Sequence, residues 1–195
     1  RDDLNLEASQ YQIKIGQKIV ADDLIYADKK LAIAGDSTNL ELSGLKVKEP
    51  AFGVDAYWID KELQADAEAK GYVIVEPDDV LTTHLNQIIN GYASDLLGQE
   101  EVQELLDNLK VSFPNLVDTV VPKVMPLNQV TSVMKCILEE GVPISDLRLI
   151  LESLSSMNIQ KMDSDDIAER IRPKLVPLLI QKLLKFKDTI PLITF

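Results

Sequence analysis

Residues 49–60 read EPAFGVDAYWID, and this stretch places three aromatic rings beside a proline and a glycine. The rings belong to Phe52, Tyr57 and Trp58, the only tryptophan of the chain. Proline and glycine are typical of turns, so the segment is predicted to be rich in turns. Two interpretations follow. The rings close a small core, which is the commoner role of clustered aromatics, or they line a surface for another protein.

The residues before this segment predict short strands. In residues 11–15 large apolar side chains occupy every second position, which is the period of a half-buried strand. Residues 29–35 and 40–47 predict two further strands, and glycine or Asp-Ser-Thr-Asn turns separate the runs. The first part of the chain is therefore expected to be mainly β.

Helical patterns dominate the rest of the chain. Residues 60–71 predict a helix with Asp60 as the N-cap and Gly71 after its last turn, and residues 72–76 predict a strand. Pro77, at a first helical position, begins a long helix that is predicted to run to residue 98. Its apolar face is formed by Val80, His84 or Leu85, Ile88, Tyr92 and Leu96, which recur at helical spacing. Further helices are predicted for 99–113, for a short run after Pro114, for 127–141, for 144–157 with Ser145 as the N-cap, for 163–172 and for 174–186, and a closing strand for 189–195. We expect an α+β fold, with small β-containing subdomains followed by a helical subdomain.

The charge of the chain limits the classes of partner. The 195 residues carry a formal net charge of -12 and 46% of them are hydrophobic, a composition that predicts a folded, acidic domain. Nucleic acid and anionic membranes are expected to be repelled, so a basic or apolar protein partner fits better. No apolar run reaches the roughly 18 residues of a membrane span.

The residues that usually carry catalysis or bind metals are sparse. His84 is the only histidine and Cys136 the only cysteine, and both lie in helical patterns where a buried or capping role is expected. Residues 163–166, Asp-Ser-Asp-Asp, lack the glycine and the glutamate of a calcium loop and predict a helix start instead. No glycine-rich phosphate loop is found, because the eight glycines are scattered singly. We therefore expect no catalytic residue, no metal site, no cofactor and no enzymatic activity.

Five blocks of the sequence resemble one known family. In chain order they are EPAFGVDAYWI, GYVIVEPDDVLTTHLNQII, LLGQEEVQELLDNLK, FPNLVDTVVPK and ILEEGVPISDLRLILESL. Together they are similar to the cytosolic domain of the type III secretion export-gate family, the FlhA/InvA/LcrD family. The resemblance covers roughly residues 1–172, and the last twenty or so residues match only loosely.

The resemblance implies four subdomains around a cleft. Residues 1–27 and 77–96 would be parts of a first α/β subdomain, and 28–76 an inserted subdomain that holds the aromatic segment. Residues 97–176 would be the helical subdomain, and 177–195 the start of a truncated fourth one. By the same comparison the chain is the cytoplasmic domain of a bacterial inner-membrane protein, and the membrane-spanning part is expected to lie outside it.

The resemblance also implies a function of docking without catalysis. Members of the family form a homo-oligomeric ring, thought to have nine subunits, below the inner-membrane export channel. They receive export substrates with their secretion chaperones, and their partners include a gatekeeper protein and other export-apparatus proteins. Three alternatives stay open: a flagellar counterpart of the injectisome protein, a purely structural ring component, and an unrecognised hydrolase.

The family also suggests which residues bind partners. The apolar recognition cleft of flagellar members matches the six residues Glu49, Phe52, Val54, Val75, Val80 and Thr83. Phe52 is then expected to be exposed, with Tyr57 and Trp58 forming the floor beneath it. Glu49 stands where flagellar members often have aspartate, and residues 90–92, Asn-Gly-Tyr, replace a more basic stretch. These two departures favour an injectisome member.

Overall fold

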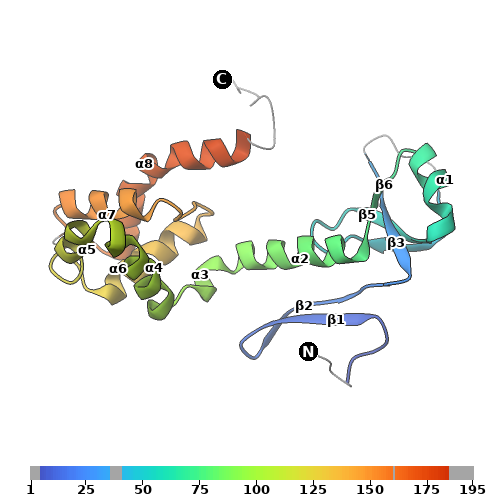
Figure 1. The fold of residues 1–195 in the computed structure, drawn as a ribbon, viewed down its shortest axis with the longest axis horizontal. Coiled ribbons are helices and arrows are strands. Elements are labelled where there is room, and N and C mark those ends of the chain that lie inside the picture. The colour runs from blue at the N-terminus through green and yellow to red at the C-terminus, as the bar shows by residue number, and fades with distance from the viewer. Residues whose placement is uncertain (1–4, 36–40, 160, 185–195) are drawn as a thin grey trace. The chain divides into compact units, whose positions relative to one another are not determined.

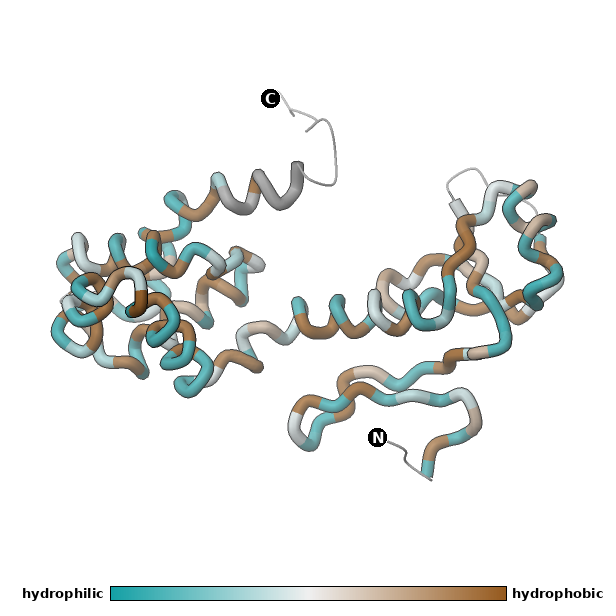
Figure 2. The backbone as a smooth tube through the Cα atoms, viewed as in Figure 1, coloured by the Kyte–Doolittle hydropathy of each residue, from teal (hydrophilic) through white to brown (hydrophobic). Residues whose placement is uncertain are grey.

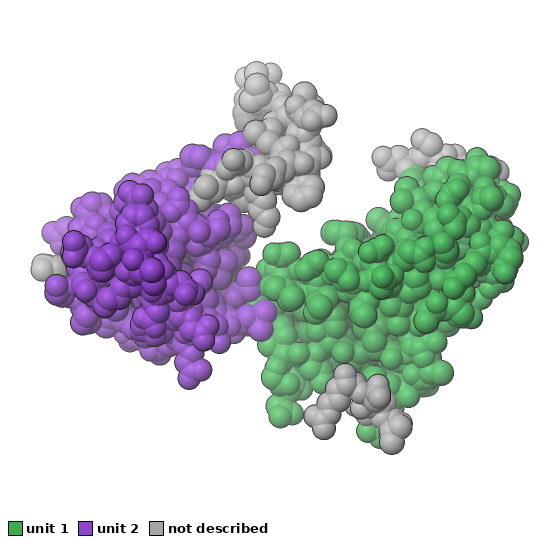
Figure 3. Space-filling model, in the orientation of Figure 1, with its two compact units in different colours: residues 1–92 green, residues 93–195 purple. Residues whose placement is uncertain are grey.

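The computed structural model describes residues 5–35, 41–159 and 161–184. The chain divides into two compact units, Arg1–Tyr92 and Ala93–Phe195 (Figure 3). The first unit contains all the described strands, and the second consists of helices and their connections. This arrangement confirms the predicted α+β class. The finer division into four subdomains stays a prediction.

The first unit begins with a two-stranded antiparallel sheet. Strand β1 (Gln10–Ile15) pairs with β2 (Lys18–Leu24) across a turn in which Gly16 has a φ of +59°. The sequence did not predict β2, because two consecutive aspartates are unusual in a strand. One of them is held in place: the Asp22 carboxylate accepts hydrogen bonds from the Gln10 and Gln12 side chains at 2.6 and 2.7 Å.

A second sheet of four strands has the order β4-β5-β3-β6 (Figure 1). The strands are β3 (Lys29–Ile33), β4 (Leu45–Lys48), β5 (Asp55–Asp60) and β6 (Val73–Val75), and every pair is antiparallel. The aromatic segment is therefore only partly a turn, because its second half is the interior strand β5.

A short helical segment covers one face of this sheet. After the 3-10 turn η1 (Lys61–Leu63), helix α1 (Gln64–Ala69) packs near the edge strand β6. The prediction that Asp60 caps this helix is wrong. Asp60 ends β5, makes no side-chain capping bond and forms an ion pair with Lys29 at 2.5 Å. Gly71 follows the helix with a φ of +84°, as the sequence predicts.

The last element of the first unit is helix α2 (Pro77–Gly91), with the proline at its first turn. Val80, His84 and Ile88 recur every four residues and are buried. Figure 2 shows hydrophobic residues along much of this helix. The sequence thus predicted the start of α2 and these buried positions. The predicted extent to residue 98 is wrong, because α2 ends at Gly91 and a separate short helix, α3 (Ala93–Leu96), follows.

The second unit packs its helices around one hydrophobic core. They are α3 (Ala93–Leu96), α4 (Gln99–Ser112), α5 (Pro114–Val120), α6 (Leu127–Glu139), α7 (Leu147–Ser156) and α8 (Ser164–Leu184). Fully buried residues from five of these helices meet in that core, among them Val102, Val120, Met134, Ile150, Leu154 and Ile171. No helix in the described part of the chain is both long enough and apolar enough to cross a membrane.

The prediction of two separate helices, 163–172 and 174–186, is wrong. One helix runs through both Pro173 and Pro177. A proline inside a helix removes a hydrogen bond and costs about 3 kcal/mol, so a break was expected. Here Ile171 and Leu175, which flank Pro173, are both fully buried, and their packing holds the helix together across it. The strand predicted for 189–195 lies outside the described residues.

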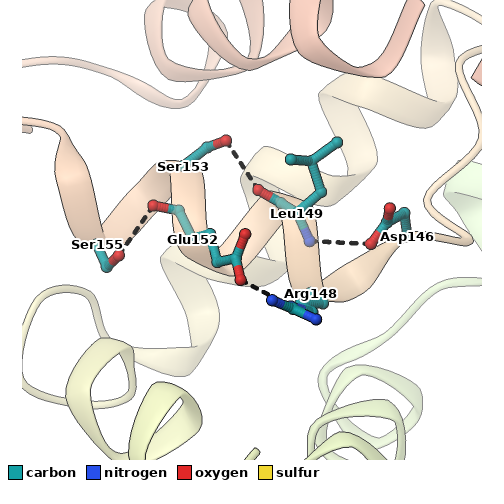
Figure 4. Close-up of polar contacts among 6 residues, drawn as sticks. All are labelled: Asp146, Arg148, Leu149, Glu152, Ser153 and Ser155. Carbon is teal, nitrogen blue, oxygen red and sulfur yellow. Dashed lines mark hydrogen bonds and ion pairs between the residues drawn. The ribbon is translucent and has the colours of Figure 1, made fainter. Parts of the chain in front are cut away.

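Helices α7 and α8 both begin with an aspartate cap. In α7 the Asp146 carboxylate accepts the backbone N–H of Leu149 at 3.0 Å, so Asp146 is the cap and the prediction of Ser145 is wrong (Figure 4). The Arg148 side chain then bonds Glu152 at 2.7 Å one turn along. In α8 the Asp163 carboxylate accepts the N–H of Asp166 at 2.8 Å, which confirms a helix start in place of a calcium loop.

Candidate docking surface

The loop between β4 and β5 folds around one buried carboxylate. Glu49 is 3% exposed, and its two carboxylate oxygens accept the backbone N–H groups of Ala51 at 2.9 Å and Phe52 at 2.7 Å. Its backbone closes the same loop, because its N–H donates to the Val54 carbonyl and its carbonyl accepts the Gly53 N–H. Glu49 thus fixes the loop conformation from inside.

Phe52 is the most exposed aromatic group of this segment. Its side chain is 71% exposed, whereas Trp58 is only 2% exposed. Gly53 follows with a φ of +68°, a conformation that other residues adopt only with strain. The loop therefore holds a large apolar ring in solvent through a defined backbone conformation.

One face of the four-stranded sheet carries two apolar rows, and the Lys29–Asp60 pair lies at the end of the same face. Residues that pair across strands lie on the same face of a sheet. The pairs define two rows across the four strands, Leu45, Trp58, Leu31 and Val75 in the first and Val47, Ala56, Ile33 and Val73 in the second. Helix α2 packs on this face, where Val80 lies with Leu31 and Trp58 of the first row and Ala56 of the second. Leu45, at the β4 end of the first row, is 46% exposed.

The second row is left partly open to solvent. Val73 at its end is 61% exposed, and Val54, which precedes Ala56 by two residues on the same face, is 40% exposed. Ile33, beside Val73 in this row, and Val47, at the other end of the row, are half-buried. We call Phe52, Val54 and Val73 with these two half-buried residues the open apolar face. Exposed apolar residues on and beside one sheet face often mark a site for another molecule.

The six residues predicted to bind partners fall into three environments. Phe52, Val54 and Thr83 are exposed, Val75 is half-buried, and Glu49 and Val80 are buried. Val80 packs under the sheet face and Glu49 under the loop, so both support the surface from within. Thr83 lies on α2 one turn after Val80.

Sequence reasoning missed Val73, Ile33 and Val47. The alternation of side chains along a strand shows only which residues of that one strand share a face. The signal that could have joined them is the strand register, which depends on which strands pair. Because β3 lies between β5 and β6, the row is assembled from segments far apart in the sequence.

The prediction that Tyr57 and Trp58 together form the floor is wrong for Tyr57. Adjacent residues of a strand point to opposite faces. Trp58 lies in the floor and contacts Tyr26, with ring centroids 5.5 Å apart. Tyr57 lies on the other face, where its ring meets Tyr72 at 6.0 Å.

His84 is buried, and its contact with Tyr11 connects α2 to the first sheet. The Tyr11 hydroxyl lies 2.5 Å from His84 Nδ1, and the two rings meet edge to face. Burial, together with the negative charges of Asp23 and Glu49, raises the pKa of the Tyr11 hydroxyl. The hydroxyl therefore stays protonated at neutral pH and can donate to the imidazole. Within the described residues no group of three potential metal ligands comes together.

Solved structures share this fold. The Chlamydia pneumoniae CdsV protein has a TM-score of 0.80 and 25% identity over 97% of this chain and 54% of that chain. CdsV in a complex with CdsO has a TM-score of 0.76 and 26% identity over 92% and 55%. The nonameric EscV cytosolic domain from the type III secretion system has a TM-score of 0.66 and 20% identity over 92% and 53%, a likeness that shows the fold alone. The class is that of cytosolic domains of type III export-gate proteins.

The sequence comparisons agree with the fold. The chain belongs to the FHIPEP family, whose model matches residues 1–195. The flagellar biosynthesis protein FlhA of Buchnera aphidicola subsp. Schizaphis graminum (strain Sg) is 35% identical over 99% of this chain and 28% of its own length. FlhA of Helicobacter pylori (strain J99) is 34% identical over 90% and 24%. The chain thus spans about a quarter of these relatives and about half of the solved domains.

Proposed function

We propose that this chain is a docking platform of a type III export gate, which receives secretion chaperones with their bound export substrates. The observation that carries the proposal is the open apolar face, where a loop held by the Glu49 carboxylate exposes Phe52 two residues before the exposed Val54. Exposed aromatic anchors surrounded by aliphatic side chains often supply most of the binding energy of an interface. Membership of the family supplies the class of cargo.

Each residue of the site has a distinct role in this proposal. Phe52 is the anchor that enters a pocket of the partner, and Val54 and Val73 extend its contact area. Val75 and Thr83 form the border toward α2. Glu49 and Val80, which the family resemblance assigns to the cleft, are buried here and hold the loop and the floor in position.

The proposal extends to the assembly. Copies of the protein form a ring at the cytoplasmic side of the inner membrane, with nine subunits as in the nonameric EscV domain. The helical unit is assigned the ring contacts. The same proposal includes the division into four subdomains. It also includes two kinds of partner, a gatekeeper protein and other export-apparatus proteins, and the CdsV–CdsO complex supports the second kind. The function is docking, without an enzymatic step.

The flagellar counterpart is the second candidate. The curated relatives named above are flagellar FlhA proteins, whereas CdsV and EscV give the structural matches. The injectisome assignment therefore rests on Glu49 and residues 90–92 alone. Deletion of the gene would separate the two systems, since an injectisome member is needed for effector secretion and a flagellar member for motility.

A photo-crosslinking experiment in the bacterium that makes the protein tests docking. The photoreactive residue p-benzoylphenylalanine would replace Phe52 or Val73, and a third variant would carry it at Glu62, which is exposed on η1 away from the open apolar face. Products at positions 52 and 73 that contain a secretion chaperone or its substrate, and are absent at position 62, would support the proposal. Products that contain only copies of this protein would favour a purely structural ring component.

A further inference from the structure

Strand β4 lies at one edge of the four-stranded sheet, next to the open apolar face. In the order β4-β5-β3-β6 it pairs with β5 alone, so its other side has no neighbouring strand in the described part of the chain. Leu45, Lys46 and Lys48 are exposed, and Val47 is half-buried. An edge strand presents unpaired backbone N–H and C=O groups, to which a further strand can bond.

The backbone groups that point outward from β4 are those of Lys46 and Lys48. The Glu49 N–H donates to the Val54 carbonyl, which makes these two residues a hydrogen-bonded pair across the β4–β5 ladder. The next residue, Asp55, accepts its hydrogen bond on the β3 side of β5 instead. Hydrogen-bonded pairs alternate along an antiparallel ladder, so the N–H and C=O groups of Lys46 and Lys48 point away from β5.

The side chains of β4 alternate between the two faces of the sheet. Leu45 and Val47 belong to the two apolar rows, and Lys46 and Lys48 therefore lie on the opposite face. A strand added beside β4 would alternate in the same way. Every second side chain of it would lie beside Leu45 and Val47, and the others beside the lysines. Such a strand would widen the open apolar face.

The charges along β4 favour one kind of added strand. Lys48 already pairs with Asp55 at 2.9 Å, whereas Lys46 makes no ion pair among the residues that the structure describes. If a second copy paired through its own β4, lysines would face lysines, and like charges on paired strands are destabilising. An acidic side chain opposite Lys46 would instead complete a cross-strand ion pair.

We propose that an extended segment of the export substrate adds to the edge of β4 as a fifth strand, with alternate apolar side chains on the open apolar face and an acidic one opposite Lys46. Main-chain hydrogen bonds would hold the segment, and its alternating side chains would give specificity. The substrate is the expected source, because a chain that is to pass an export channel is unfolded and has free backbone groups. This inference rests on the proposed docking function and adds the form of peptide that the site binds.

Amide hydrogen exchange, followed by NMR on ¹⁵N-labelled residues 1–195, tests this proposal. The protein would be mixed with a chaperone–substrate complex of the same secretion system, or with the chaperone alone. We expect the N–H groups of Lys46 and Lys48 to exchange at least about tenfold more slowly with the complex, and at an unchanged rate with the chaperone alone. The N–H of Val47 is the control within the same strand, because the ladder directs it toward β5.

A charge reversal tests the acidic contact separately. Lys46→Glu should weaken binding of the complex at least about fivefold, because it places a carboxylate opposite the acidic side chain of the added strand. Lys61→Glu is the matched control, since it makes the same change of charge at an exposed residue of η1, outside the sheet. Equal binding by Lys46→Glu and the unmodified protein would overturn the proposed acidic contact.

The exchange experiment separates failure of this inference from failure of the docking proposal. Binding of the complex that depends on Phe52 but does not protect Lys46 and Lys48 would show that docking occurs without the β4 edge. Protection by the chaperone alone would assign the edge to the chaperone, and protection that grows with the concentration of this protein alone would assign it to a second copy. Both results would overturn the inference. A complex that does not bind at all would contradict the proposed function, and this inference with it.

Discussion

Glu49 and Phe52 are three residues apart, and the first holds the second in place. Removing the Glu49 carboxylate would leave the N–H groups of Ala51 and Phe52 without their acceptors in a mostly buried setting. We predict that Glu49→Ala lowers the free energy of unfolding by about 1–3 kcal/mol. Glu49→Gln, which keeps one acceptor oxygen, should cost less. Urea denaturation measures both, and equal stability of Glu49→Ala and the unmodified protein would contradict this role.

Cys136 is predicted to be an unreactive thiol. Burial, with a smaller contribution from the neighbouring Asp165 carboxylate, raises the pKa of Cys136 to about 11. At pH 8 only on the order of one thiol in a thousand is then ionised, and the thiolate is the reactive form. Alkylation by iodoacetamide at pH 8 should be at least about tenfold slower in the folded protein than in urea, and should accelerate up to about pH 11. A rate equal to that of the denatured protein would refute the assignment.

The cap of helix α7 gives a prediction that distinguishes two adjacent residues. Asp146 accepts the Leu149 N–H, whereas the sequence pointed to Ser145. Asp146→Ala should therefore lower stability by about 0.5–2 kcal/mol, and Ser145→Ala by much less. Thermal or urea denaturation of the two variants is sufficient. A larger loss for Ser145→Ala would mean that the helix begins one residue earlier.

Periodicity predicted individual elements better than the way in which they join. It located β1, β3, β6 and α2 because each has a clear apolar period. It missed β2, where Asp22 is held by glutamine side chains from β1, and it split α8 at Pro173, where burial outweighs the proline cost. Both failures have the same cause, namely tertiary contacts that overrule a local preference.

The candidate site shows the same limit. The family resemblance pointed to Phe52 and Val54, which are exposed, and also to Val80, which is not. Val73 could not be found without knowing that β6 pairs with β3. Strand pairing joins residues 33, 47, 54 and 73 into one surface, and no pattern in a single segment contains that information.

The two units each have their own hydrophobic core, and this predicts independent folding. The core cluster of the helical unit draws its buried residues from position 97 onward, and the two clusters of the first unit draw theirs from positions 31–80. A protein of residues 93–195 should therefore melt cooperatively and retain helical circular dichroism. A gradual, non-cooperative melt would show that the helical unit depends on the first one.

The protein of residues 1–195 should be mainly monomeric in dilute solution. A net charge of -12 opposes association of copies, and the ring is expected to need the rest of the family's domain and the high local concentration at a membrane. Light scattering at micromolar concentration should give the mass of one chain. A stable ring under these conditions would contradict the expectation.

The docking claim is tested most directly by calorimetric titration of a chaperone–substrate complex of the same secretion system into two variants. One variant lacks the Phe52 side chain and the other lacks the Trp58 side chain. Phe52→Ala should weaken binding by about 2 kcal/mol, roughly thirtyfold, and leave the melting temperature nearly unchanged, because the ring is exposed. Trp58→Ala should lower stability by about 3–5 kcal/mol, because that ring is in the floor. If Phe52→Ala binds the complex as tightly as the unmodified protein, the open apolar face is not the docking site.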